Sequence, residues 1–387
     1  MATYSDTDSS SEDPGDQEVP VPVGNDRLSF GVELEFVIAT LEDGEDDPYP
    51  SDPRPVFGLR RPTGADASKV NPKPGNMSHR DLVLATRQYN IATEKEVASR
   101  VEALLKQYGY AVTFASKDNA TRQAWHIKPE ALKNPDDIHY WVYLEVNSPA
   151  YYFGADPIAQ TKEVCKLITK NFRAVCNQKA DTGLHVHVGN GLKGFDLLTL
   201  RNAMALLWTF EKQFDELHPK WRKDVDSYSD NLRTSVLGKS GLSDREGLEY
   251  ILEIASTKQL FKDFAQTNSK LNYNLSNLRG DEAKKTIEFR QHEGTLSPTS
   301  IENWIKVCVG ILEFASAVKE NDLETWAKEN IDKDIDEYDV VQVLCVLGLY
   351  DQAVFYGLRM EQEKIDAAQA AADAYEDELA KGFAGLF

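Results

Sequence analysis

In four short stretches of this sequence, apolar residues alternate with a second set that includes acidic, histidine or arginine residues. The first, Phe30–Ile38, reads FGVELEFVI and places two glutamates two residues apart. Carboxylates and imidazoles bind divalent cations, and arginine binds phosphate or carboxylate groups through a fork of two hydrogen bonds. The stretches therefore carry the residue types for metal-assisted chemistry on a charged substrate. The residues concerned are Glu33, Glu35, Glu145, His185, His187, Glu288 and Arg290.

The same stretches have the alternation that is typical of β-strands with one buried face. In Phe30–Ile38, Val32, Leu34 and Phe36 point to one side and the two glutamates to the other. For any single stretch, a strand whose acidic face lies in water is the ordinary interpretation. Four stretches of the same design instead predict a sheet whose apolar face is covered by helices and whose other face gathers the charged residues. The other three stretches are Tyr140–Ser148, Thr182–Gly189 and Thr286–Glu293.

The residue types in this set favour phosphoryl chemistry at a site for hard metal ions. Carboxylates outnumber imidazoles, which suits Mg²⁺ or Mn²⁺ better than zinc. The sequence contains no GxxxxGK[ST], GxSxG or HExxH motif, so nucleotide phosphates would be held by metals and arginines instead of a P-loop. Glu288 and Arg290 lie on one strand face, about 6–7 Å apart along the backbone. One can therefore bind a metal ion while the other binds phosphoryl oxygens.

The composition argues against several classes of protein. Acidic residues outnumber basic ones by 63 to 43 in a chain of 387 residues, which leaves a net charge of −20. Nucleic acid and anionic membranes require a basic surface, so neither is expected as a partner. No run approaches the roughly 18 apolar residues of a membrane helix, and the N-terminus has no apolar signal region, which predicts a cytoplasmic protein. The cysteines are expected to be buried reduced thiols, because Cys165, Cys176, Cys308 and Cys345 form no CxxC pair.

The chain outside the four stretches predicts a single α+β domain over residues 27–387, with a helical part from about residue 298. Residues 1–26 are rich in serine and acidic residues and predict a disordered acidic tail. Thr40–Asn76 is dense in proline, glycine and aspartate, which indicates a long loop insertion that is a candidate lid.

The strongest helix is expected at Asp196–Leu217, with Asp196 as its N-cap and with Trp208 and Phe210 in the core. Apolar residues at helical spacing predict several more helices, and alternation predicts three more strands. The helices are expected at Glu94–Tyr108, Asp156–Gln178, within Arg245–Phe264, at Ile301–Val318 and at Gln362–Ala380. The strands are expected at Tyr110–Ser116, Arg122–Lys128 and Lys270–Leu278.

The motifs, in this order along the chain, resemble the putative amidoligase family. The resemblance rests on FGVELEF, LEVNSP, TGLHVHVG and NYNLSNL…TIEFRQHEGTL, and on LLWTFEKQFDELHPKWRKDVDSY after the histidines, between about Arg27 and Phe314. That family belongs to the glutamine synthetase and γ-glutamylcysteine synthetase superfamily of carboxylate–amine ligases. The resemblance implies a glutamine synthetase-like catalytic domain, in which a curved antiparallel sheet lines the active site and helices pack on its other face.

The resemblance also implies roles for the motif residues. It makes Glu33, Glu35, Glu145, His185 and Glu288 the ligands of two or three divalent metal ions. Arg290 would contact the γ-phosphate of ATP and, with Glu288, would be catalytic. Glu130, at a position shifted from an acidic residue of the family, is left outside the predicted site.

A second group of polar residues is predicted to contact the nucleotide or a substrate. His187 either orients a metal ligand or touches nucleotide or substrate. Arginines outside the motifs are candidate phosphate or substrate ligands, although an exposed arginine is most often only solvated. His292 shares the face of Arg290 and is expected at the solvent-exposed end of its strand. The predicted cofactor contacts are Arg290, Arg279, Arg222, Asn274 and His187, with Arg233 as a further candidate.

The implied activity is that of an ATP-dependent carboxylate–amine ligase. A carboxylate is a poor electrophile toward amines, so γ-phosphoryl transfer would give an acyl phosphate that an amine converts to an amide. Metal ions and Arg290 would stabilise the phosphoryl transfer, and the Thr40–Asn76 loop would exclude water. The expected cofactors are ATP and Mg²⁺ or Mn²⁺, and the expected partners are a small carboxylate and a small amine.

Three other interpretations are open on sequence alone. A guanidino-type kinase on a related scaffold would give a stable phosphorylated product and would need no amine. A zinc hydrolase built on His185, His187 and Glu288 would hold zinc tightly and bind no nucleotide. A non-catalytic binding protein would keep the fold without activity, although the complete ligand set argues against such a loss. The sequence indicates no particular oligomeric state.

Overall fold

The structure is a computed structural model of the 387-residue chain. It describes residues 27–42, 44–59, 79–114, 123–129, 140–176, 181–223, 229–265, 270–280 and 284–384. The predicted acidic tail at residues 1–26 and the residue Glu130 lie outside this part of the chain, as do residues 43 and 60–76 of the predicted long loop.

The described strands form one ten-stranded sheet, most of whose neighbouring strands are antiparallel. They are β1 (Ser29–Glu42), β2 (Phe57–Leu59), β3 (Val112–Phe114), β4 (Trp125–Pro129), β5 (Tyr140–Asn147), β6 (Tyr151–Tyr152), β7 (Ala174–Val175), β8 (Gly183–Gly189), β9 (Tyr273–Asn274) and β10 (Thr286–Glu293). The main path runs in the order β3-β4-β5-β1-β8-β10-β9, and β2, β6 and β7 pair with β1 outside it. The pairs β3–β4 and β1–β2 are parallel.

The four strands predicted from the alternating stretches are neighbours in the sheet, in the order β5, β1, β8 and β10. Each of the three contacts between them is antiparallel. Because the alternation is in register across these pairs, the apolar residues point to one side. Leu34, Phe36 and Val186 are buried there at 1% exposure or less. The predicted antiparallel arrangement is confirmed.

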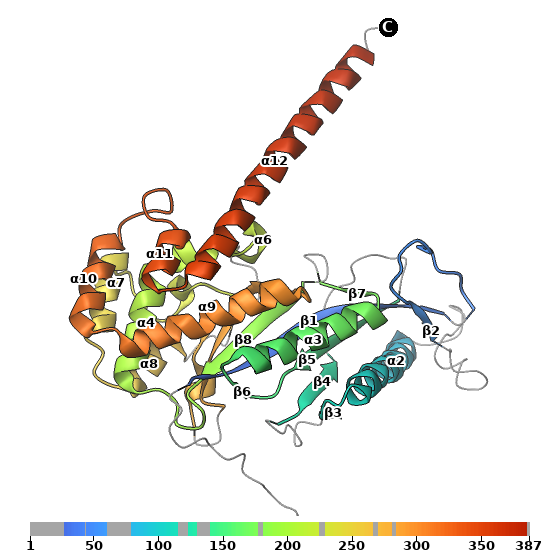
Figure 1. Ribbon diagram of the computed structural model, residues 1–387, viewed down its shortest axis with the longest axis horizontal. Helices are drawn as coiled ribbons and strands as arrows, with labels where there is room; N and C mark the ends of the chain where they lie inside the picture. Colours follow the sequence, from blue (N-terminus) through green and yellow to red (C-terminus); the bar gives the residue numbers. More distant parts are fainter. Residues whose placement is uncertain are drawn as a thin grey trace, which may run out of the picture.

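Helices cover the apolar face of the sheet. The described α-helices are α2 (His79–Gln107), α3 (Ala155–Asn171), α4 (Leu197–Thr209), α5 (Glu211–Asp215), α6 (Lys220–Lys223), α7 (Asp244–Leu252), α8 (Thr257–Phe264), α9 (Pro298–Ala317), α10 (Glu320–Asn330), α11 (Val340–Val346) and α12 (Tyr350–Ala384), with 3-10 turns η1 (Leu232–Thr234) and η2 (Ser276–Leu278). Figure 1 shows α3 and α9 along β1 and β8, and α2 beside β3 to β5. The α+β class is therefore confirmed.

The predicted helix Asp196–Leu217 is divided between α4 and α5. Asp196 is its N-cap as predicted, because the carboxylate accepts the backbone N–H of Thr199 at 2.8 Å. The helix ends at Thr209, and Phe210 leaves the helical conformation before α5 begins. Trp208 and Phe210 are buried, which confirms their predicted place in the core.

Two other predicted elements are shorter in the structure. The predicted strand Lys270–Leu278 pairs with β10 only at Tyr273 and Asn274. It ends there because Oδ1 of Asn274 accepts the backbone N–H of Ser276 at 2.9 Å, which turns the chain into η2. The predicted helix Asp156–Gln178 ends at Asn171, and the chain then becomes extended to pair with β1 as β7.

The cysteines are free thiols, as predicted. Cys165 and Cys308 are buried. Cys176 and Cys345 are only partly buried, which corrects the prediction that all four are buried.

The described half of the predicted long loop is held against the sheet. Residues 40–42 extend β1, and residues 57–59 pair with them as β2. Arg173 is 3% exposed and donates to both carboxylate oxygens of Asp47 at 2.8 Å. It also donates to the backbone carbonyl of Arg54 at 3.1 Å. The rest of the predicted loop, at residues 60–76, lies outside the described residues, and its role as a lid stays a prediction.

Replacing Arg173 with methionine is expected to lower the free energy of unfolding by about 2–4 kcal/mol, because Asp47 and buried backbone carbonyls lose their donor. Chemical denaturation measures this loss, and limited proteolysis within residues 44–59 localises it. The matched control is Arg54→Met, because Arg54 is 40% exposed and pairs with Asp52 at 2.7 Å. It is expected to cost less than about 1 kcal/mol, and an equal loss in both variants would contradict the anchoring role of Arg173.

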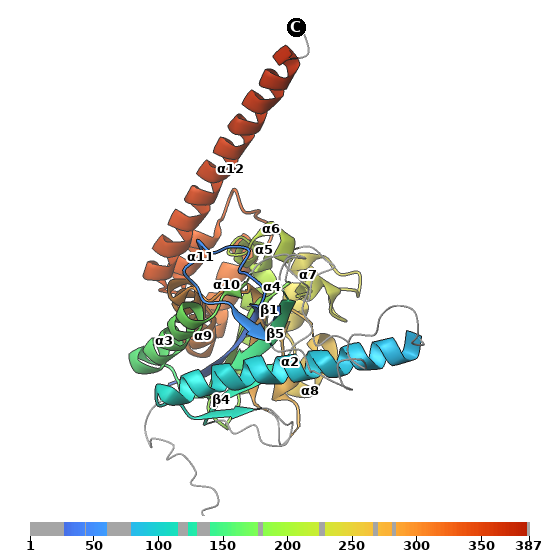
Figure 2. The ribbon, with the colours of Figure 1, turned by 90° about the vertical axis from the view of Figure 1, so that its right-hand side faces the viewer.

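The C-terminal helix α12 extends away from the sheet, as Figures 1 and 2 show. Its first turns pack on α11 and α9, where Ala353 and Tyr356 are buried. Residues 361–374 are exposed all around the helix, and the predicted helix Gln362–Ala380 lies within α12. No helix in the described part of the chain has the length and apolar character needed to span a membrane.

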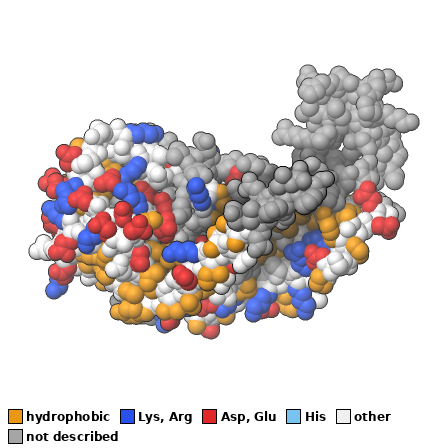
Figure 3. Space-filling model, turned by 90° about the horizontal axis from the view of Figure 1, so that it is seen from above, with side chains coloured by type: hydrophobic (Ala, Val, Ile, Leu, Met, Phe, Trp, Pro, Cys, Tyr) orange, Lys and Arg blue, Asp and Glu red, His pale blue; other side chains and the backbone are white. Residues whose placement is uncertain are grey.

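Charged side chains on the face seen in Figure 3 are intermixed at the left-hand end, where α7 and α10 lie. Arg245 of α7 forms an ion pair with Asp332 and donates to the backbone carbonyl of Lys328 at 3.0 Å. These contacts tie α7 to the end of α10.

Candidate functional site

The polar face of the sheet carries three short rows of polar residues, each of which crosses two or three strands. Neighbouring strands lie about 4.8 Å apart and same-face residues about 7 Å apart along a strand, so strand pairing alone brings these side chains together. The paired residues are His187–Glu288–Asn274, Glu33–His185 and Glu35–Glu145–Lys128.

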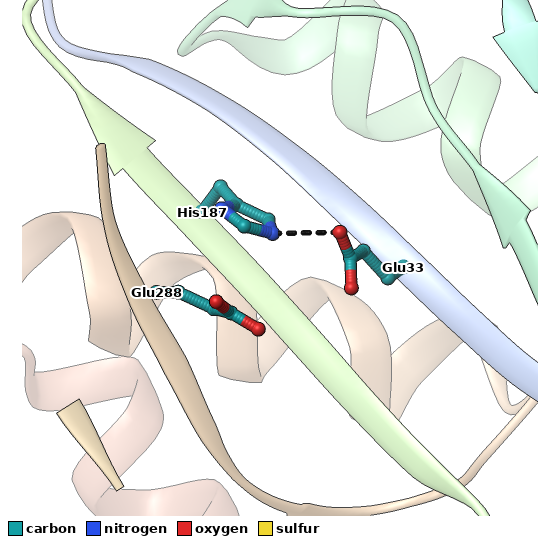
Figure 4. A group of neighbouring side chains, drawn as sticks. All are labelled: Glu33, His187 and Glu288. Carbon is teal, nitrogen blue, oxygen red and sulfur yellow. Dashed lines mark hydrogen bonds and ion pairs between the residues drawn. The ribbon is translucent and has the colours of Figure 1, made fainter. Parts of the chain in front are cut away.

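Glu33, His187 and Glu288 point toward one another from β1, β8 and β10 (Figure 4). One ligand atom from each lies within 4.8 Å of the other two. The Nε2 atom of His187 is 2.9 Å from Oε1 of Glu33, and its Nδ1 atom is 3.1 Å from Oγ1 of Thr286. An imidazole fixed at one nitrogen that faces carboxylates with the other has the arrangement of metal-binding histidines.

His185 lies between the same carboxylates. Its Nδ1 atom is 3.2 Å from Oε2 of Glu33 and 3.7 Å from Oε1 of Glu288. Its Nε2 atom is 3.8 Å from Oε1 of Glu35. His185 therefore joins the Glu33 row to the Glu35 row, and both of its nitrogens face carboxylates.

Glu35 and Glu145 form the third row beside this group. Oε2 of Glu35 accepts the backbone N–H of Gly183 at 2.7 Å. A Cβ atom at Gly183 would lie 3.1 Å from Oε2 of Glu35 and 2.9 Å from Nε2 of His185, so a larger residue would displace the ends of these side chains. Glu145 is 3% exposed and lies 2.8 Å from Nζ of Lys128. The sheet thus gathers all of the predicted metal ligands on one face. Together with His187, the residues Glu33, Glu35, Glu145, His185 and Glu288 are called the acidic group below.

Arg290 and Glu288 form an ion pair on β10. The guanidinium of Arg290 also lies 3.5 Å from Nδ1 of His185. Glu288 accepts hydrogen bonds from the side-chain amides of Asn274 at 2.8 Å and Asn277 at 3.2 Å. These amides fix the Glu288 carboxylate. Because Arg290 is paired with that carboxylate, its guanidinium is held at the edge of the acidic group.

The carboxylates of this group differ in the direction of their pKa shifts. Burial alone would raise the pKa of Glu33, but His187 and His185 hold it well below its ordinary value. Burial is likewise outweighed at Glu288, whose pKa is lowered chiefly by His187. At Glu145 burial and the nearby Glu33 raise the pKa despite Lys128. Buried carboxylates require nearby cations, and here Lys128, Lys284 and Arg290 supply positive charge.

Arg222 is buried at 4% exposure. It donates to the backbone carbonyls of Arg290 at 2.7 Å and of Gln291 at 3.2 Å. These carbonyls belong to a β-bulge, because pairing with β8 shifts register between Phe289 and His292. Arg222 therefore stabilises the segment that carries Arg290, and its predicted contact with a nucleotide stays a prediction.

The same bulge changes the position of His292. The extra residue reverses the alternation after Phe289, so His292 is paired with Leu184 and points into the core. Its ring centroid is 5.4 Å from that of Trp304 and 5.5 Å from that of His218. Burial lowers the pKa of His292 to about 3. The prediction that His292 shares the face of Arg290 and touches solvent is wrong, because simple alternation does not continue through a bulge.

Two of the other candidate contacts, Arg279 and Arg233, have their described partners elsewhere. Arg279 is exposed and donates to the backbone carbonyl of Ala265 at 3.3 Å. Arg233 lies 3.8 Å above the ring of Trp208 and pairs with Asp244 at 2.9 Å. Asn274 lies within the group as a partner of Glu288. The arrangement favours Asn274 as a residue that positions a carboxylate.

Five residues that contact the site were not among those predicted for it. They are Lys128, Lys284, Thr286, Asn277 and Gly183. Thr286 precedes Glu288 by two residues within β10, so alternation already places it on the same face. Lys128 likewise lies on a predicted strand. For these two residues the signal was therefore present in the sequence, although an isolated lysine or threonine is usually a solvated residue. Lys284 lies before the strand and outside its alternation.

The described donor set fits a hard divalent cation. Glu33 and Glu288 offer carboxylate oxygens and His187 offers one imidazole nitrogen, all within a buried region where a charge is only weakly screened. The adjacent guanidinium of Arg290 is a ligand for phosphoryl or carboxylate oxygens. The arrangement can therefore hold a metal ion beside an anionic group.

A family model described as "Putative amidoligase enzyme" matches residues 26–312 of the chain, which is more than half of its length. The matched segment includes every described strand and each residue of the acidic group. No curated protein matches the chain.

Proposed function

The chain belongs to the putative amidoligase family, and on this basis we propose that it is an ATP-dependent ligase that joins a carboxylate to an amine through an acyl phosphate. The observation that carries the proposal is the convergence of Glu33, His187 and Glu288 beside Arg290 on one sheet face. The family description supports a ligase, and the oxygen-rich donors support metal-assisted phosphoryl transfer. A glutamine synthetase-like domain is part of the same proposal.

The ligand residues of the site would form two metal-binding sets. Glu33, His187 and Glu288 would hold one divalent ion, and Glu35, Glu145 and His185 would hold a second. The bound ions, Mg²⁺ or Mn²⁺, would neutralise the charge that develops on the transferred phosphoryl group.

Around these ligands, protein groups fix orientation. Arg290 would bind the phosphoryl oxygens in a fork, since it already lies against Glu288. Asn274 and Asn277 hold the Glu288 carboxylate, and the backbone N–H of Gly183 holds that of Glu35. Groups that are already oriented before the reaction do not need to rearrange in the transition state. This electrostatic preorganisation is usually the largest single contribution to catalysis.

The decisive test incubates the purified protein with ATP and Mg²⁺ and a matrix of amino acids and small amines. Phosphate release is expected only where both a carboxylate and an amine are present, and mass spectrometry should detect the amide. Glu33→Gln is expected to reduce the rate about a hundredfold or more, because it removes a buried charge that offsets the metal.

Other outcomes of this matrix favour the alternatives. A stable phosphorylated product without any amine requirement would favour a kinase. Tightly bound zinc without nucleotide turnover would favour a hydrolase built on His185, His187 and Glu288. If no pair of carboxylate and amine gives turnover, the result would favour a non-catalytic binding protein.

A further inference from the structure

Lys284 contacts the acidic group from just outside β10. Its Nζ atom is 3.3 Å from Oε1 of Glu33. The same carboxylate oxygen is 2.9 Å from Nε2 of His187. Two positively polarised groups therefore already share the oxygen that a metal ion between Glu33 and Glu288 would need.

Lys284 differs in its exposure from the residues that it contacts. Its side chain is 57% exposed, whereas those of Glu33, His187 and Glu288 are between 6% and 13% exposed. An ammonium on a flexible four-carbon stem that already reaches solvent can leave its partner without being buried elsewhere. Lys284 is thus attached to the group by an interaction that a stronger cation can replace.

A divalent ion and this ammonium compete for the same place. A cation bound to Oε1 of Glu33 would lie within a few ångströms of Nζ of Lys284, where like charges repel. Because the Lys284 side chain is 57% exposed, solvent reaches the side of the group from which it approaches. A released lysine there is positioned to contact phosphate as a point charge.

From this geometry we infer that Lys284 is a displaceable counterion of the metal centre. In the metal-free protein its ammonium neutralises Glu33, and when a divalent ion binds it transfers to the phosphate group of the nucleotide. The inference rests on the proposed function, because it requires a metal ion at Glu33 and a nucleotide beside it.

The test measures binding of Mn²⁺ alone to the free protein by calorimetry or electron paramagnetic resonance. Lys284→Met is expected to bind Mn²⁺ roughly three- to tenfold more tightly than wild type, because a repelling charge is gone. Lys284→Arg keeps the charge and is expected to stay within about twofold of wild type. The matched control is Lys285→Met, which makes the same change in net charge one residue away, where Nζ contacts the backbone carbonyl of Gly280. It is expected to change Mn²⁺ affinity less than about twofold, since a solvated charge farther from the ion is screened.

A second measurement follows binding of a non-hydrolysable ATP analogue with Mg²⁺. Lys284→Met is expected to weaken it about tenfold, which is opposite in sign to the Mn²⁺ result, and Lys285→Met is expected to leave it nearly unchanged. A merely structural role would move both affinities in the same direction. Unaltered analogue binding in Lys284→Met would overturn the phosphate contact.

The outcomes separate this inference from the proposed function. If wild type binds Mn²⁺ and Lys284→Met binds it no more tightly than Lys285→Met does, the counterion role is wrong and the ligase proposal stands. If wild type binds no Mn²⁺ at millimolar concentration, both fail. Thermal unfolding of each variant confirms that the comparison is between folded proteins.

Discussion

Replacing Arg290 with alanine is expected to lower the rate of amide formation about a thousandfold or more. An arginine that stabilises a transferring phosphoryl group typically contributes 10³–10⁵-fold. Arg290 forms an ion pair with Glu288 and lies 3.5 Å from Nδ1 of His185, so it borders the proposed metal ligands without itself offering a ligand atom. Steady-state phosphate release with both substrates measures the loss, which should appear mainly in kcat.

Three comparisons make this result specific. Mn²⁺ binding to Arg290→Ala should be no weaker than in wild type, because the ligand atoms are retained and a positive charge beside Glu288 is removed. Arg290→Lys should recover little activity, since lysine keeps the charge but not the fork. Arg245→Ala, which removes an exposed pair with Asp332, should leave the activity unchanged. Residual activity of Arg290→Ala within tenfold of wild type would show that Arg290 is only a partner of Glu288.

Replacing His187 with alanine is expected to weaken Mn²⁺ binding about 10–100-fold. Its Nε2 atom faces the two carboxylates, and Oγ1 of Thr286 holds its other nitrogen at 3.1 Å. A metal-bound histidine fixed in this way offers a prepared lone pair, and loss of the outer partner alone also weakens metal binding. Thr286→Val should therefore reduce the affinity in the same direction and by a smaller factor.

The sequence resemblance instead makes His185 the ligand, so His185→Ala is the matched comparison. His185 lies 3.2 Å from Glu33 and 3.8 Å from Glu35, between two rows of carboxylates. If His185→Ala weakens Mn²⁺ binding more than His187→Ala does, the ligand is the histidine that the resemblance implies. Two titration steps in wild type, each lost in a different variant, would assign one histidine to each metal ion.

The β-bulge in β10 shows where prediction from alternation stops. Alternation is a property of neighbouring residues, so it correctly placed Glu288 and Arg290 beside the acidic residues of other strands. The extra residue after Phe289 reverses the pattern for His292, which packs on Trp304 instead of touching solvent. A bulge depends on the partner strand and on Arg222, which binds its carbonyls from α6. Neither influence is visible within the eight residues of the strand.

The sequence by itself determined the residue types of the polar face, the identity of the four central strands and the family. Each of these follows from local alternation and from motifs a few residues long. Only the tertiary structure decided which side chains meet, because strand order and register join segments more than a hundred residues apart in the chain. Register set His187 against Glu288, and pairing with β4 brought Lys128 to Glu145. The fold also brought Lys284 to Glu33 and placed Arg222 against the carbonyl of Arg290 in the bulge.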